Sequence, residues 1–218
     1  MRRAFAAIVI VALVSVAQTA SAGQVSFDFA SEVAATITFT GTGDKIEFPN
    51  TGTYDFVIID SGSSLTGLSG NIGGPFTVGA ISPITGGETA SVAGSGSFSV
   101  DDGAGKTLSA VLNLVKITVY SGLSGVLNGD GVANLSNITY SGSNSTLLDI
   151  VSGAEQTVVM TFQFSPLKKK TLSQLMTDGQ VNSTSYSGSL SSVPEPCIGV
   201  LLAGAAIGLV AFARRRRT

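Results

Sequence analysis

The sequence predicts an all-β domain, an antiparallel β-sandwich or jelly-roll-like fold, flanked by an N-terminal signal peptide and a C-terminal transmembrane helix. Apolar and polar residues alternate in many short segments, and clusters of Gly, Ser, Asn and Asp separate these segments. The 218 residues include 27 Gly, and only 12% are charged. This composition is typical of one exported, Gly-rich β domain.

The N-terminal residues have the three parts of a secretory signal peptide. Arg2 and Arg3 supply a positive charge, residues 4–17 are apolar, and Ala20 and Ala22 occupy the small-residue positions that a signal peptidase recognises. Roughly 14 apolar residues are fewer than the roughly 20 that a membrane-spanning helix needs. We therefore expect residues 1–22 to be removed by cleavage after Ala22.

The body of the chain, residues 23–184, is expected to form about eight to ten short strands of a single β domain. A period of two gives each strand one buried and one solvated face. The segments expected to be strands are residues 25–29, 36–40, 54–59, 98–100, 108–120, 135–140, 147–151 and 157–164.

The longest apolar segment changes its alternation once. Leu108, Ala110, Leu112 and Leu114 share one parity, whereas the apolar residues that follow, from Val115 onward, have the opposite parity. A one-residue shift exchanges the two faces of a strand. The sequence therefore predicts a β-bulge, or a bend between two sheets, between Leu114 and Val115.

The connections within the body follow from local residue types. Residues 101–105, Asp-Asp-Gly-Ala-Gly, predict a hairpin loop. One short helical turn is expected where Leu172, Leu175 and Met176 follow an i, i+3, i+4 spacing. The dense Gly, Ser and Asn content of residues 61–145 leaves a stacked parallel solenoid as an alternative, although no fixed repeat period is present.

The composition excludes several kinds of catalytic site. The chain has no His and a single Cys, so Ser-His-Asp triads, Cys-His pairs, His-based zinc sites and thiolate clusters are excluded. Paired carboxylates remain, but the chain has no Trp and only four Tyr to form a sugar platform. We expect no enzyme, no catalytic residue, no cofactor and no resident metal. Calcium on Asp101 and Asp102, or on residues 128–131, is an alternative to ordinary turn formation.

Charge also restricts the partners. Residues 23–196 contain 6 Lys and no Arg against 14 acidic residues, a formal net charge of −8. A nucleic acid is therefore not an expected partner.

The C-terminal residues combine four features in a fixed order. Residues 185–192 are expected to be a polar linker, and Pro194-Glu195-Pro196 follows it. The 17 apolar residues 197–213 would span about 25 Å as a helix, enough for a short membrane crossing. The chain then ends in a basic cluster that would stay in the cytoplasm, formed by Arg214, Arg215, Arg216 and Arg217.

Together, residues 193–218 resemble the PEP-CTERM sorting signal of Gram-negative bacteria. The Pro-Glu-Pro motif, the apolar helix and the Arg cluster stand in the order of that family. The resemblance implies an exosortase in the inner membrane that recognises Pro194, Glu195 and Pro196 and cleaves near them. It covers the tail alone and implies nothing about the body.

These observations predict an exported structural protein of the cell surface or extracellular matrix, with signal peptidase, exosortase and, transiently, the inner membrane as partners. Biofilm or exopolysaccharide would be the surrounding material. The alternatives are a carbohydrate- or calcium-binding adhesion module, and a membrane-anchored surface protein that is never cleaved at its tail. A secreted glycosidase would need two carboxyl groups about 5 to 9 Å apart in one cleft.

Overall fold

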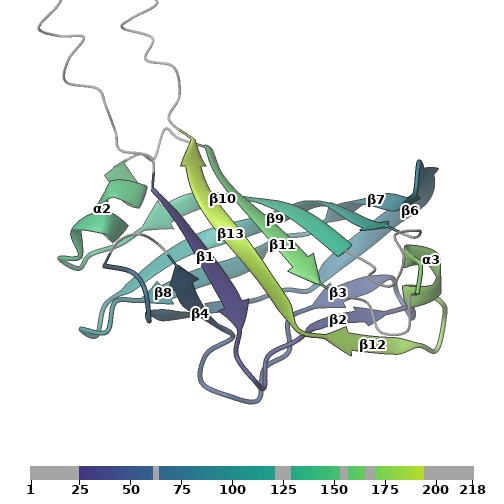
Figure 1. The fold of residues 1–218 in the computed structure, drawn as a ribbon, viewed down its shortest axis with the longest axis horizontal. Helices are drawn as coiled ribbons and strands as arrows, with labels where there is room; N and C mark the ends of the chain where they lie inside the picture. Colours follow the sequence, from purple (N-terminus) through teal and green to yellow (C-terminus); the bar gives the residue numbers. More distant parts are fainter. Residues whose placement is uncertain (1–24, 61–63, 121–128, 153–156, 165–169, 194–218) are drawn as a thin grey trace, which may run out of the picture. The chain divides into compact units, whose positions relative to one another are not determined.

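Strands make up most of the chain that the structure describes. The computed structural model describes residues 25–60, 64–120, 129–152, 157–164 and 170–193 (Figure 1). Residues Gln24–Val193 form one unit, which is the unit considered below. Its elements are β1 (Ser26–Ser31), β2 (Ile37–Thr40), β3 (Lys45–Glu47), β4 (Phe56–Asp60), β5 (Ser69–Ile72), β6 (Phe76–Ile84), β7 (Gly87–Ala93), β8 (Gly96–Asp101), β9 (Thr107–Tyr120), β10 (Gly129–Thr139), α2 (Ser145–Ser152), β11 (Thr157–Phe164), α3 (Leu172–Leu175), β12 (Val181–Thr184) and β13 (Tyr186–Val193).

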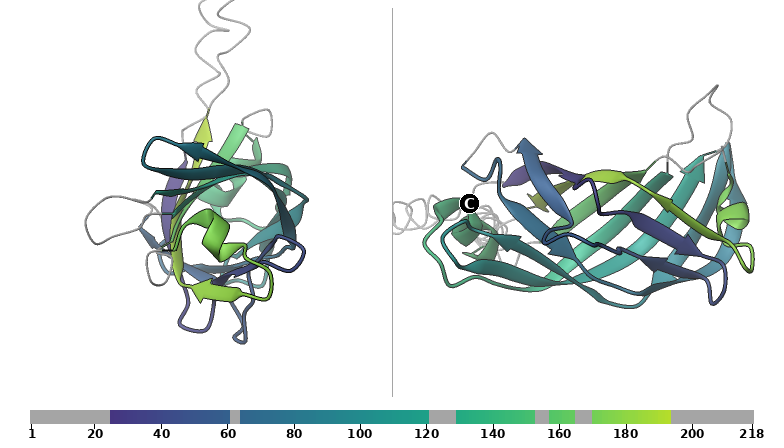
Figure 2. Two further views of the ribbon diagram at one scale, coloured as in Figure 1. Left: turned by 90° about the vertical axis from the view of Figure 1, so that its right-hand side faces the viewer. Right: turned by 90° about the horizontal axis from the view of Figure 1, so that it is seen from below.

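Eight of the strands close into an antiparallel barrel. Their order is β10-β11-β13-β1-β4-β5-β8-β9, and the pairing of β9 with β10 completes the ring. The order continues from β9 through β7, β6, β3 and β2 to β12. An end-on view shows the strands encircling a common axis (Figure 2).

Strand β9 belongs to both parts of the sheet because it changes partner along its length. Residues 107–112 pair with β8, and residues 116–120 pair with β7. Between them, Val132 pairs with Lys116 and Ala133 pairs with Leu114, so Val115 is left as an extra residue and is 45% exposed. The predicted β-bulge at Leu114 and Val115 is confirmed, and it lets buried residues continue on the new parity at Ile117 and Val119.

The prediction of an antiparallel all-β domain is confirmed, but the division into two sheets is wrong. A sandwich or jelly roll needs two facing sheets, whereas the described strands form one continuous sheet that closes on itself. The solenoid alternative is also wrong, because every pairing between the described strands of residues 61–145 is antiparallel. The alternation of apolar and polar residues predicts that a strand has a buried face, but it does not predict which element packs against that face.

Residues 185–192, expected to be a polar linker, lie within the barrel wall. Strand β13 pairs with β11 on one side and with β1 on the other. Leu190 is buried on its inner face, and its serines alternate outward, apart from the buried Ser192. The hydroxyl of Ser192 accepts a hydrogen bond from the backbone N–H of Val25 at 2.8 Å. The two ends of the described unit are thus joined side by side at Val25 and Ser192.

Two short helices lie at opposite ends of the barrel, α2 at one end and α3 at the other (Figures 1 and 2). Leu147 and Ile150 of α2, and Leu172 and Leu175 of α3, are buried. The helical turn expected at Leu172, Leu175 and Met176 is confirmed as α3. Burial of these side chains closes each end with apolar contacts.

The strand expected at residues 147–151 is wrong, because this segment is helix α2. The side-chain carbonyl of Asn144 accepts hydrogen bonds from the N–H groups of Thr146 and Leu147, at 3.1 and 3.2 Å. An Asn in this position caps the start of a helix. The i, i+3 spacing of Leu147 and Ile150 then places both side chains on the buried face.

Phenylalanine rings fill the interior. The rings of Phe56 and Phe98 stack with centroids 5.4 Å apart, and those of Phe29 and Phe56 lie 5.0 Å apart. Full burial of such a side chain contributes about 1.5–3 kcal/mol to stability. Five phenylalanines among the described residues are less than 2% exposed: Phe29, Phe39, Phe56, Phe76 and Phe98.

Two of these rings lie over glycines of the adjacent strand. Phe56 pairs with Gly70 and Phe29 pairs with Gly188. A Cβ atom would lie 2.4 Å from Cζ of Phe56 at Gly70 and 2.5 Å from Cζ of Phe29 at Gly188. Both rings therefore require a residue without a side chain opposite them.

Among the described residues, no helix combines the length and the apolar character needed to cross a membrane. The signal peptide predicted for residues 1–22 and the transmembrane helix predicted for residues 197–213 lie outside the described residues.

We predict that Gly70→Ala lowers the free energy of unfolding by about 1–3 kcal/mol, the usual cost of overpacking. The added methyl group would meet the Phe56 ring and would also lie 2.1 Å from the carbonyl oxygen of Ser99. Chemical denaturation measures the change. Ser69→Ala, one residue away on β5 and half-buried, is the matched control and is expected to change stability by less than about 0.5 kcal/mol. Equal stability of the two variants would contradict the proposed constraint.

Candidate functional site

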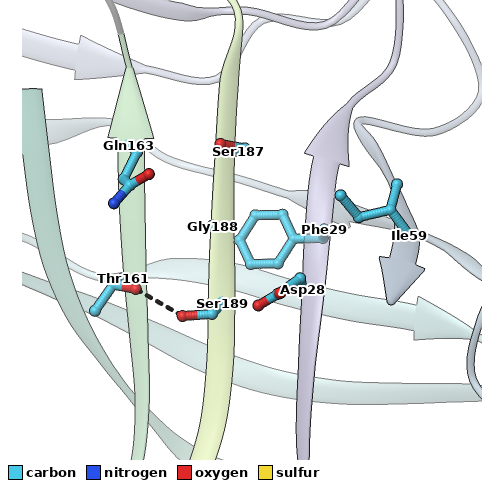
Figure 3. A pocket seen from close by; sticks show the side chains of 8 residues that line it. All are labelled: Asp28, Phe29, Ile59, Thr161, Gln163, Ser187, Gly188 and Ser189. Carbon is cyan, nitrogen blue, oxygen red and sulfur yellow. Dashed lines mark hydrogen bonds between the residues drawn. The ribbon is translucent and has the colours of Figure 1, made fainter. Parts of the chain in front are cut away.

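A groove of about 240 Å³ lies across four adjacent strands of the barrel wall, β11, β13, β1 and β4 (Figure 3). The residues that line it are Asp28, Phe29, Ile59, Thr161, Gln163, Ser187, Gly188 and Ser189. Asp28, Ile59 and Gln163 are exposed, which places the groove on the outer face of the sheet.

Strand register assembles the polar side of the groove. Ser189 pairs with Asp28 on β1 and with Thr161 on β11. Two residues along, Ser187 pairs with Gln163. Directly paired residues of antiparallel strands project from the same face, so these five polar side chains face the groove together.

A second β-bulge supplies the apolar side. Asp28 pairs with Asp60 and Phe29 pairs with Ile58, so Ile59 is an extra residue on β4. A bulge redirects the side chain of its extra residue. Ile59 is accordingly 53% exposed and lies at the edge of the groove, whereas its neighbour Ile58 is buried.

Hydrogen bonding within the groove uses only part of its capacity. The hydroxyls of Thr161 and Ser189 are 2.9 Å apart and hydrogen bonded to each other (Figure 3). Among the described residues, none forms a hydrogen bond with the side chains of Asp28, Gln163 or Ser187. A carboxylate, an amide and a hydroxyl therefore converge with free hydrogen-bonding positions.

The described lining of the groove offers hydrogen-bonding groups and few ionisable ones. Among the described residues that line the groove, Asp28 is the single ionisable one. Glycoside hydrolysis by a carboxylate pair would need a second acid across the cleft. The described residues also contain no cluster of three or more His, Cys, Asp or Glu that could hold a metal ion.

The residues predicted to direct sorting lie outside the described residues. These are the signal-peptidase positions Ala20 and Ala22, the motif Pro194, Glu195 and Pro196, and the basic cluster Arg214, Arg215, Arg216 and Arg217. Sequence reasoning missed the groove, because residues 185–192 were assigned to a linker. The alternation of Ser187, Ser189 and Ser191 with Leu190 was the available signal for a strand.

The hairpin loop predicted at residues 101–105 is confirmed between β8 and β9. One carboxylate oxygen of Asp101 accepts a hydrogen bond from the N–H of Gly103 at 2.8 Å, and the other accepts one from the hydroxyl of Tyr54 at 3.1 Å. Gly103 has a φ of 72°, a conformation that suits glycine. Asp101 thus stabilises the hairpin turn through these hydrogen bonds.

Asp102 performs a similar role in the same hairpin. Its carboxylate accepts hydrogen bonds from the N–H groups of Ala104 and Lys106, at 2.7 and 2.9 Å, and from the hydroxyl of Tyr140 at 2.7 Å. These hydrogen bonds, that of Tyr140 above all, lower the pKa of Asp102. The calcium alternative at Asp101 and Asp102 would compete with this network.

Asp55 is a buried acid elsewhere in the barrel, 4% exposed. Its carboxylate accepts a hydrogen bond from the N–H of Ile72 at 2.6 Å. Burial raises the pKa of Asp55, and the hydrogen bonds from Ile72 and from the side chain of Asn50 oppose that shift. Burial also raises the pKa of Tyr186, whose hydroxyl donates to the carbonyl oxygen of Asp55 at 3.3 Å.

Comparisons with protein-family models, curated proteins and solved structures find no match to this chain.

We predict that replacing Asp55 with Asn removes one pH-dependent contribution to stability, that of the Asp55 carboxyl group. A raised pKa means that the folded state binds the proton more tightly than the unfolded state. The contribution of Asp55 to the free energy of unfolding is then greatest below the ordinary value of 3.8 and falls as pH rises through the raised pKa. The stability of Asp55→Asn relative to the wild type is expected to increase between about pH 3.5 and pH 7, measured by urea denaturation.

Asp55→Ala separates charge from hydrogen bonding. It leaves the N–H of Ile72 without its acceptor, so it is expected to be less stable than Asp55→Asn at every pH. A stability difference between Asp55→Asn and the wild type that stays constant across this range would contradict the prediction.

Proposed function

We propose that this protein is an exported, non-catalytic component of the cell surface or extracellular matrix, released from its sorting tail by an exosortase. The resemblance of residues 193–218 to the PEP-CTERM signal supports the sorting route. The hydroxyl-rich exterior of the barrel and the chain's lack of His support a structural or adhesive role.

One observation carries the proposal: the expected processing sites coincide with the ends of the folded sheet. Cleavage after Ala22 removes no strand residue, because β1 begins at Ser26. Strand β13 ends at Val193, and Pro194 is the next residue of the chain. Cleavage after Ala22 and at or beyond Pro194 would therefore leave all thirteen described strands intact.

The position of β13 also restricts where the tail can be cut. Ser192 is fully buried, and its N–H donates a hydrogen bond to the carbonyl oxygen of Val25 at 2.9 Å. Cleavage before this residue would remove contacts from the closed barrel. The Pro residues at 194 and 196 cannot donate to a β-ladder and favour an extended backbone, which a protease cleft can accept.

The test compares the intact mass of the native protein with that of a Pro194→Ala, Pro196→Ala variant, each recovered from cell-surface and medium fractions. We expect the native protein to lack residues 1–22 and every residue beyond its cleavage site near Pro194–Pro196. We expect the variant to retain the tail.

Pro83→Ala is the matched control, because Pro83 is exposed on β6 and far from the tail in the sequence. It should be processed like the wild type. A native protein that still carries Arg214, Arg215, Arg216 and Arg217 would overturn the proposal and favour a permanent anchor.

A further inference from the structure

We propose that the groove across β11, β13, β1 and β4 binds a neutral saccharide. This inference concerns the folded barrel and does not depend on how the tail is processed. It rests on the convergence of five polar side chains, three of which have no hydrogen-bond partner among the described residues, beside one exposed apolar side chain.

The lining of the groove offers contacts to both the hydroxyl groups and the C–H groups of a sugar ring. Ligand sites combine apolar contact area with a few polar groups that fix orientation. The carboxylate of Asp28 can accept hydrogen bonds from sugar hydroxyls, and the amide of Gln163 can donate and accept. Ile59, 53% exposed, offers an apolar surface to the C–H groups of a sugar ring.

The polar groups also have a spacing that an extended ligand can follow. Neighbouring strands lie about 4.8 Å apart, so Thr161, Ser189 and Asp28 form a row about 10 Å long across three strands. Ser187 and Gln163 form a second, parallel row. A saccharide lying along these rows can contact several groups at once.

Charge restricts the class of saccharide. The described residues that line the groove include the carboxylate of Asp28 and no Lys or Arg. A phosphate, a sulfate or a uronic acid would be repelled by Asp28 without a compensating cation. A neutral saccharide donates hydroxyl protons to Asp28 and meets no such penalty.

The groove is open, and a single sugar would leave much of its surface in water. We therefore expect weak binding of a monosaccharide, with a Kd on the order of 1 mM. A polysaccharide displayed at high density would bind many copies of the protein and gain avidity.

The test uses the full-length chain in detergent and affinity electrophoresis through gels that contain a neutral polysaccharide. The neutral probes are dextran, starch, mannan and galactan, and alginate is the acidic comparison. The variants are Gln163→Ala and Asp28→Asn in the groove. Asn134→Ala on β10 and Asp149→Asn on α2 are the matched controls, since both residues are exposed.

We expect at least one neutral polysaccharide to retard the protein and alginate to retard it less. Gln163→Ala should weaken binding about threefold to tenfold, as expected for one lost hydrogen bond. Asp28→Asn should weaken it about tenfold, because a charge-assisted hydrogen bond is stronger. The two control variants should bind like the wild type.

Three results would overturn the proposal: no retardation by any neutral probe, stronger retardation by alginate, or neutral-probe binding that neither groove variant changes. Thermal melting of each variant checks the fold. If a groove variant melts early, Ile59→Ser replaces it, because this change removes the apolar surface and alters no side-chain hydrogen bond. Unchanged binding by a stably folded Ile59→Ser would then count against the site.

Discussion

The contact between a phenylalanine ring and a glycine on the paired strand is the constraint on which the barrel depends. At Phe56 and Gly70, and again at Phe29 and Gly188, the ring occupies the space that a Cβ atom would need. A closed sheet has a limited interior, and large side chains fit only where small ones face them. The glycine content is therefore partly a packing requirement and not solely a source of turns.

Gly188 connects this packing to the outer surface. On the inner side its missing side chain admits the ring of Phe29, and on the outer side its neighbours Ser187 and Ser189 face the groove. Strand β13 pairs with β11 along its whole length and with β1 from Ser187 to Ser191. The groove is consequently built on a rigid part of the wall, which keeps its polar side chains in place without a loop.

Much of the secondary structure could be predicted, since alternation reveals strands directly. The parity change at Leu114 and Val115 even located a bulge. The serines and Gly188 of β13 resemble a linker, and the apolar residues of α2 resemble a short strand unless Asn144 is recognised as a helix cap. Barrel closure and the groove depend on register between strands distant in sequence, such as Asp28 with Ser189, which one sequence does not encode in any local pattern.

The course of β13 has a mechanical consequence. This single strand runs from the groove, at Ser187 and Ser189, to the end of the folded unit at Val193. Ladder hydrogen bonds lie perpendicular to an antiparallel strand. A tension that enters the groove through β11 or β1 and leaves at Val193 would thus load the bonds between β13 and that neighbouring strand in shear, so that these bonds share the force. A pull that separated Val25 from Ser192 would instead open the β1 and β13 pair one bond at a time. The barrel would therefore resist a force directed along β13 more strongly than a force that pulls β1 and β13 apart.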